Sequence, residues 1–209
     1  MTEIANADIE INAENGTLMQ AGTIQVGDSL FTSTNNFRMA GSMPIYDLHL
    51  VSPNDLNNYN SQIASLNYIV NNNICINQRQ TLNLNGNILN LKGNLSNYGN
   101  LNATPAASTT QPWRILLDGV GDQYFKNFNL SIPELEIYSL SLNKTTGNFL
   151  LGDNDTTTNS SVKINDNLEF QTDNLAYIDA NSFNQKVIVG PNSAGLGLKQ
   201  ITRNTLGHI

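Results

Sequence analysis

Residues 81–101 read TLNLNGNILNLKGNLSNYGNL. The pair Gly-Asn occurs three times in this stretch, at steps of seven and six residues, and each pair is followed by an apolar residue: Ile88, Leu95 or Leu101. Steps this short suit a tightly wound meander or a solenoid-like region, in which each turn buries one residue against the next. We therefore expect residues 74–101 to form a Gly-Asn repeat region of β structure.

The chain on either side of this repeat has the pattern of short strands separated by turns. Asn15-Gly16 is the pair that a tight hairpin turn needs, because both central residues take positive φ. Alternating or apolar runs predict strands within 9–28 and at 30–32, 45–51, 134–142, 148–152, 162–164, 168–170 and 186–190. The sequence thus predicts a mainly β fold, with short strands in hairpins, in intertwined β structure or in a sandwich.

The composition narrows the functional classes. Only 13% of the 209 residues are charged, the net charge is −7, and the ten Lys and Arg residues are scattered, so no basic face is available for nucleic acid or an anionic membrane. The single cysteine, Cys75, forms no intrachain disulfide and, between Ile74 and Ile76, is expected to be a small buried residue. The N-terminus shows no secretory signal, and no apolar run approaches the ~20 residues that span a bilayer.

Asparagine makes up about one residue in six. Asparagine is favoured in turns and can form amide ladders along β structure. An AT-rich genome would enrich it without any structural cause, and the sequence leaves both explanations open.

Residues 52–73 stand out from this pattern because they are spaced like a helix. Ser52 and Pro53 suit the N-cap and first helical positions, and Asp55 completes a motif like a capping box. Apolar residues then follow at alternating steps of three and four, which is the spacing of a coiled-coil seam, at Leu56, Tyr59, Ile63, Leu66 and Val70. We expect a short helix near 53–72 that packs along this seam in a homotrimer; a single helix lying across a sheet is the first alternative, and the absence of any helix is the second.

The prolines at 105 and 112 lie in a polar, small-residue stretch that predicts a linker at 102–112. The expected organisation is an N-terminal β segment (1–51), the helical seam (52–73), the Gly-Asn repeat region (74–101), the linker, and a C-terminal β domain (113–209).

No catalytic, cofactor-binding or metal-binding set can be identified. The two histidines, His49 and His208, share no metal-ligand spacing, and no nucleophile motif is present. Glu134 and Glu136 are expected on one face of a strand, where they would repel each other or bind a cation. Asp153-Asn154-Asp155 is interpreted as an ordinary turn in preference to a calcium loop, because it lacks the spacing and final Glu of an EF-hand.

This combination, a β-rich Asn/Thr/Gly chain with no secretory signal, a short polar helix with a seam, and no catalytic set, resembles a bacteriophage-type virion appendage such as a tail fibre or head fibre. The resemblance implies a non-enzymatic virion protein, made in the host cytoplasm, that assembles as a homotrimer with other virion proteins and meets host-surface polysaccharide. A capsid decoration or tail protein with a β-sandwich fold is the alternative, and a carbohydrate-active enzyme whose carboxylates meet only in space is a third.

Overall fold

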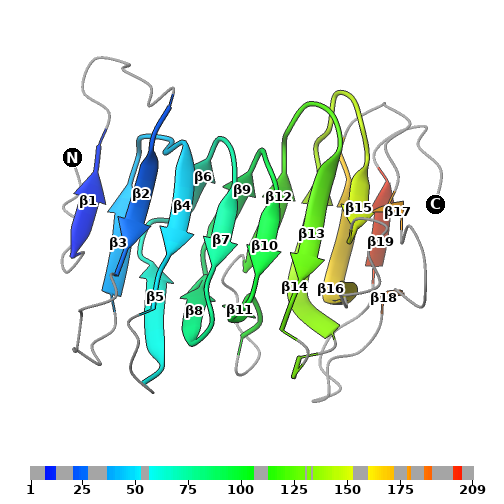
Figure 1. Ribbon diagram of the computed structural model, residues 1–209. Coiled ribbons are helices and arrows are strands. Elements are labelled where there is room, and N and C mark those ends of the chain that lie inside the picture. Colours follow the sequence, from blue (N-terminus) through cyan, green and yellow to red (C-terminus); the bar gives the residue numbers. More distant parts are fainter. Residues whose placement is uncertain are drawn as a thin grey trace.

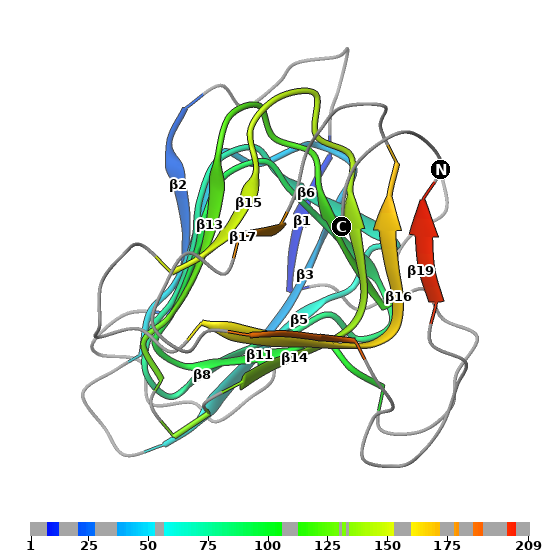
Figure 2. The ribbon, with the colours of Figure 1, turned by 90° about the vertical axis from the view of Figure 1, so that its right-hand side faces the viewer.

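The computed structural model describes residues 8–12, 21–27, 37–52, 57–105, 113–129, 131–132, 134–152, 160–171, 178–179, 186–189 and 200–203. The described strands form three sheets, and every pair of neighbouring strands is parallel. The chain therefore winds as a β-solenoid, with strands stacked from the N-terminal to the C-terminal end (Figure 1) and three sheets around the axis (Figure 2).

Each sheet collects strands from successive turns of the chain. Sheet A contains β1 (Ile9–Ile11), β3 (Phe37–Gly41), β5 (Tyr59–Ile63), β8 (Gln80–Asn83) and β11 (Asn100–Asn102). Sheet B contains β2 (Thr23–Val26), β4 (Asp47–Leu50), β7 (Ile74–Ile76), β10 (Leu95–Asn97), β13 (Gln123–Asn127), β15 (Phe149–Leu151) and β17 (Ile178–Asp179). Sheet C contains β6 (Asn67–Val70), β9 (Ile88–Leu91), β12 (Arg114–Leu117), β14 (Glu134–Leu142), β16 (Ser161–Phe170) and β18 (Val187–Val189), and β19 (Gln200–Arg203) also pairs with β16.

The Gly-Asn repeat marks the corners of the solenoid. The pairs at 86, 93 and 99 lead into β9, β10 and β11, which belong to sheets C, B and A in turn. One step of the repeat is therefore one side of the coil, and three sides make a turn: Ile74 is in register with Leu95, 21 residues later. The solenoid-like interpretation is confirmed, with the difference that stacked residues are three repeat steps apart rather than one.

Glycine is needed at such a corner because the turns are in backbone contact there. A Cβ on Gly93 would lie 2.2 Å from the carbonyl oxygen of Asn72, which belongs to the preceding turn. That distance is far inside van der Waals contact, so only a residue without a side chain fits between the two turns.

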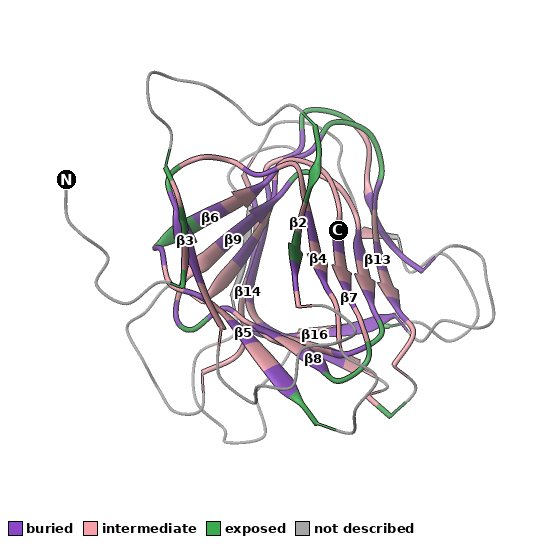
Figure 3. Ribbon diagram, turned by 60° about the vertical axis from the view of Figure 1, so that its left-hand side comes forward, coloured by how far each residue is buried: buried purple, intermediate pink, exposed green. Residues whose placement is uncertain are grey.

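The interior of the solenoid is one apolar core built from columns of stacked side chains. Alternate strand residues point inward, and Figure 3 shows buried residues recurring along the strands of all three sheets. In sheet B one such column is in register from turn to turn: Leu48, Ile74, Leu95, Phe125 and Leu151. A single cluster of buried side chains extends from Val26 to Phe170.

Asparagine has a structural use at the corner that precedes sheet B. The backbone N–H groups of Asn73, Asn94 and Tyr124 each donate to the side-chain Oδ1 of the residue one turn earlier, which is Asp47, Asn73 and Asn94 respectively, at 2.8, 3.0 and 2.9 Å. A second amide contact lies inside the core, where Asn97 Nδ2 donates to Asn127 Oδ1 at 2.9 Å. The bonds at the corner satisfy backbone N–H groups from turn to turn, and the Asn97–Asn127 bond pairs two buried side-chain amides.

The predicted helix is wrong. Its described residues form β5 and β6 instead, and Tyr59, Ile63 and Val70 are buried in the chain's own core while Leu66 is 63% exposed; Leu56 lies outside the described residues. Residues 59–63 also alternate buried and half-buried, which is the period of a strand. Tertiary packing overrides the three-four spacing here, because Asn and Ser between the apolar positions are weak helix formers. The buried side chains are unavailable as a trimer seam.

The mainly β prediction is confirmed, whereas the strands in the described part of the chain form neither hairpins nor a sandwich. β1 and β2 flank the Asn15-Gly16 pair but pair with β3 and β4 in different sheets. Of the predicted second-half strands, 134–142 is found with the same bounds as β14, and 162–164 and 168–170 merge into β16.

Two sheets run across the predicted domain boundary. β12 pairs with β9 in sheet C, and β13 pairs with β10 in sheet B, so strands on the two sides of residues 102–112 share a core. Residues 106–112 themselves lie outside the described part of the chain. The described halves are thus one continuous solenoid rather than two separately packed domains.

Candidate functional site

Sheet A is interrupted where the chain passes from β11 to β14. The register of β14 with β16 shifts between Ile137 and Ser139, and the second part of β14 continues sheet C beside β12. The first part lies in line with sheet A, next to β11 (Figure 2). There the two strands share one isolated bridge, Ala103 with Ile137, in which Tyr138 N–H donates to Ala103 O at 2.9 Å.

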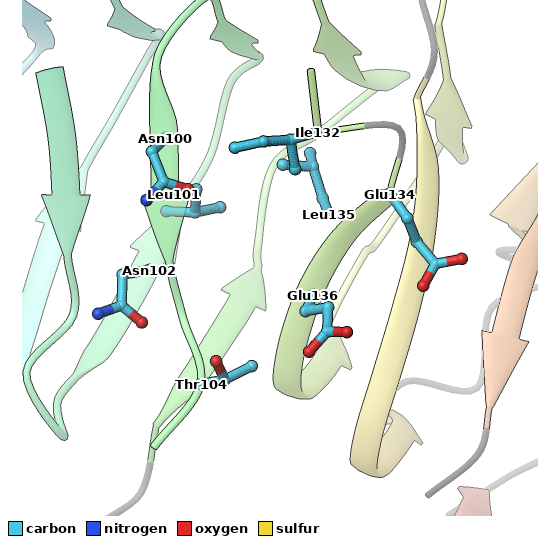
Figure 4. Close-up of a pocket in the computed structure, with 8 residues that line it drawn as sticks. All are labelled: Asn100, Leu101, Asn102, Thr104, Ile132, Glu134, Leu135 and Glu136. Carbon is cyan, nitrogen blue, oxygen red and sulfur yellow. The ribbon is translucent and has the colours of Figure 1, made fainter. Parts of the chain in front are cut away.

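A groove of about 250 Å³ lies at this interruption. We name it the A-face groove and define it by its lining residues, which are Asn100, Leu101, Asn102, Thr104, Ile132, Glu134, Leu135 and Glu136 (Figure 4). The polar members alternate with buried Leu101, Ala103, Leu135 and Ile137, so strand geometry directs them outward. The groove therefore combines amide, hydroxyl and carboxylate groups with three apolar side chains, and the polar groups can exchange hydrogen bonds with a small polar ligand.

The carboxylate of Glu136 is held in place from β16. Lys163 Nζ donates to Glu136 Oε1 at 2.7 Å, and Asn165 Nδ2 donates to Oε2 at 3.3 Å. The hydrogen bond from Lys163 lowers the pKa of Glu136 below its ordinary value, against a smaller opposing effect of burial. At neutral pH Glu136 therefore lines the groove as an ionised side chain in a fixed orientation.

The prediction that Glu134 and Glu136 share one strand face is confirmed, because both are half-buried and flank the fully buried Leu135. Sequence reasoning missed Asn100, Asn102 and Thr104 as their neighbours. The Gly99-Asn100 corner was visible in the sequence, but the bridge that brings β11 beside β14 spans 34 residues, from Ala103 to Ile137, and no local pattern encodes it.

Among the described residues, two further candidates from the sequence lie side by side. His49 and Cys75 are register neighbours in sheet B. Asn77 Oδ1 lies 3.2 Å from His49 Nε2 and accepts from Cys75 Sγ at 3.5 Å. Cys75 is half-buried rather than buried, and burial raises the pKa of its thiol, which disfavours a reactive thiolate.

Metal binding finds no support among the described residues, where no group of three or more His, Cys, Asp or Glu side chains is placed to hold an ion. Asp153-Asn154-Asp155 and His208 lie outside those residues.

No protein-family model, no curated protein and no solved structure matches the chain. Within the part of the chain that the structure describes, no helix is long and apolar enough to cross a membrane.

Proposed function

We propose that the protein is a non-enzymatic structural component of a virion appendage, of the bacteriophage tail-fibre or head-fibre kind, and that it binds host-surface glycan through the A-face groove. In this proposal it assembles as a homo-oligomer, with three copies as the expected number, and contacts other virion proteins. The observation that carries the binding role is the groove itself, a polar recess with a fixed carboxylate at an interruption of an otherwise continuous solenoid.

The architecture is compatible with the appendage role. A solenoid of stacked parallel strands presents regular outer faces along its axis. Because Tyr59, Ile63 and Val70 are buried within one chain, contacts between copies in this proposal use outer surfaces. Light scattering with size-exclusion chromatography tests the assembly: a mass about three times 22.9 kDa supports it, and a monomer at high concentration counts against it.

The groove suits glycan binding because of its side chains. Asn100, Asn102 and Thr104 offer donors and acceptors to sugar hydroxyls, and the carboxylates of Glu134 and Glu136 accept from them. Rigid strands hold these groups, so little conformational entropy is lost when a ligand is bound.

The ionised state of the Glu136 carboxylate favours a glycan-binding protein over a carbohydrate-active enzyme. A glycosidase needs one carboxylic acid that stays protonated and one carboxylate. Lys163 lowers the pKa of Glu136, which makes this residue a poor general acid. Glu134 and Glu136 lie two residues apart on one strand face, a fixed spacing of about 7 Å between Cα atoms, and both point outward rather than converging on a point between them.

The experiment is a binding screen that also records turnover. The protein is titrated against neutral oligosaccharides containing glucose, galactose, mannose or N-acetylglucosamine, and products are followed by mass spectrometry. We expect binding without cleavage, and about three- to tenfold weaker binding for Asn102→Ala, the loss for one or two hydrogen bonds.

Gln62→Ala is the matched control for this variant, since Gln62 lies on the outer face of sheet A two turns earlier. Cleavage of any glycan would favour the enzyme alternative, and absence of binding across the screen would remove the glycan role.

A further inference from the structure

The A-face groove is bounded at both ends along the strand direction. β11 and β14 run in the same direction, and the bridge between Ala103 and Ile137 joins them near Thr104 and Glu136. At the other end, Phe128 N–H donates to Asn97 O at 2.7 Å and Asn129 Nδ2 donates to Gly99 O, so the corners that lead into β11 and β14 are joined as well. Figure 4 shows Asn100 and Ile132 at one end of the groove and Thr104 and Glu136 at the other. The recess is a bounded pocket, which we name the wedge, rather than a channel along the face.

The size of the wedge limits what enters it. Its 250 Å³ is slightly below the ~300–1,000 Å³ of pockets that hold drug-sized ligands. At ~30 Å³ for each water in the liquid, the wedge corresponds to about eight waters. One pyranose ring displaces about that much solvent, so a second ring lies outside the recess.

The charge of the wedge excludes acidic sugars. Glu134 and Glu136 both line it, and Glu136 is kept ionised by the hydrogen bond from Lys163 at 2.7 Å. Lys163 Nζ donates to one carboxylate oxygen of Glu136, and Asn165 Nδ2 donates to the other. Both donors are therefore directed at Glu136 rather than at an acidic ligand. The net charge of −7 adds a long-range repulsion of acidic sugars.

We propose that the wedge recognises the terminal residue of a glycan chain and that this residue is a neutral sugar. The inference rests on the proposed function and adds to it the part of the glycan that is bound and its charge. Asn100 and Asn102 contact the hydroxyls of the terminal ring, the half-buried Ile132 packs against its apolar face, and the rest of the chain leaves toward solvent.

The test uses pairs of oligosaccharides built on the neutral sugars of the screen. The first pair differs in length, as a trisaccharide and a hexasaccharide with the same non-reducing terminal residue. The second pair differs in charge, since the terminal residue carries either its ordinary C6 hydroxyl or a C6 carboxylate. A third ligand carries the C6 carboxylate on an internal residue instead. Dissociation constants are measured by titration calorimetry at neutral pH.

If the wedge binds one neutral terminal ring, the trisaccharide and the hexasaccharide should bind with the same affinity within about twofold, because one ring is bound in each. It predicts at least tenfold weaker binding when the terminal residue carries the carboxylate, and little change when an internal residue does. Glu134→Gln should recover part of the affinity for the terminal acid, and Gln62→Ala should not.

Affinity that rises with chain length, or equal binding of the acidic and neutral termini, would overturn this inference and leave glycan binding in place. Absence of binding to every member of the screen would overturn the glycan role as well, so the two failures are distinguishable.

Discussion

Gly93→Ala tests the stacking of one turn of the solenoid on the next. The added Cβ would lie 2.2 Å from the carbonyl oxygen and 2.4 Å from the carbonyl carbon of Asn72, whereas ordinary contacts are 3.4–4 Å. The two turns must therefore separate locally by more than 1 Å, and the atoms in the way are backbone, which cannot rotate aside. Because overpacking costs ~1–3 kcal/mol and occasionally more, we expect Gly93→Ala to lower the free energy of unfolding by about 3 kcal/mol.

Gly121→Ala is the matched control, since it adds the same methyl group at another solenoid corner. A Cβ there meets nothing within 4 Å, and only the positive φ of 76° opposes it. The expected loss is about 1 kcal/mol from left-handed backbone strain. Urea unfolding followed by far-ultraviolet circular dichroism measures both variants. A Gly93→Ala variant that is as stable as Gly121→Ala would refute the close backbone contact between turns.

Three further changes test the core and its polar contacts. Asn97→Ala removes the buried hydrogen bond to Asn127 and should cost about 2 kcal/mol in urea unfolding. Burial lowers the pKa of Lys144 from 10.5 to about 8. Between these two pH values the unfolded chain therefore binds more protons than the folded chain. The free energy of unfolding should consequently rise with pH across this window, by at most about 3 kcal/mol. Lys144→Met, compared with the native chain at each pH, should remove that rise; an unchanged slope would contradict it. A fragment of residues 106–209 lacks the partners of β12 and β13 and should fail to give a cooperative unfolding transition, whereas a soluble, cooperatively folded fragment would restore the predicted domain boundary.

The strands could largely be predicted from the sequence because their signals are local. The apolar alternation of residues 134–142 and the Gly-Asn corners near 86, 93 and 99 depend only on neighbouring residues. Their pairing could not be predicted in the same way. Parallel strands one turn apart are separated by 21 or more residues in sheet B, and an Asn-Gly pair that favours a hairpin in isolation says nothing of such partners.

The helix failed as a prediction for a related reason. Positions 59, 63 and 70 are apolar at helical spacing, but they are also inward positions of two strands that meet at a corner. A turn of the chain between two period-two strands produced steps of three and four by coincidence. The Asn and Ser residues between them are poor helix formers and were the signal against a helix.

One side of the candidate site was visible in the sequence. Glu134 and Glu136 share a strand face because of the period of that strand alone. Asn100, Asn102 and Thr104 resembled the many other outward polar residues until the bridge from Ala103 to Ile137 placed them opposite the carboxylates.

Hydrogen–deuterium exchange with and without glycan tests the binding role most directly, because it locates the ligand as well as detecting it. The tightest neutral oligosaccharide of the screen is the ligand, at saturating concentration. We predict slower exchange in peptides that cover residues 99–105 and 131–138, which flank the A-face groove, and unchanged exchange in residues 57–63 on the same face. Protection confined to another part of the solenoid, or none in a complex that calorimetry shows to be saturated, would contradict the account.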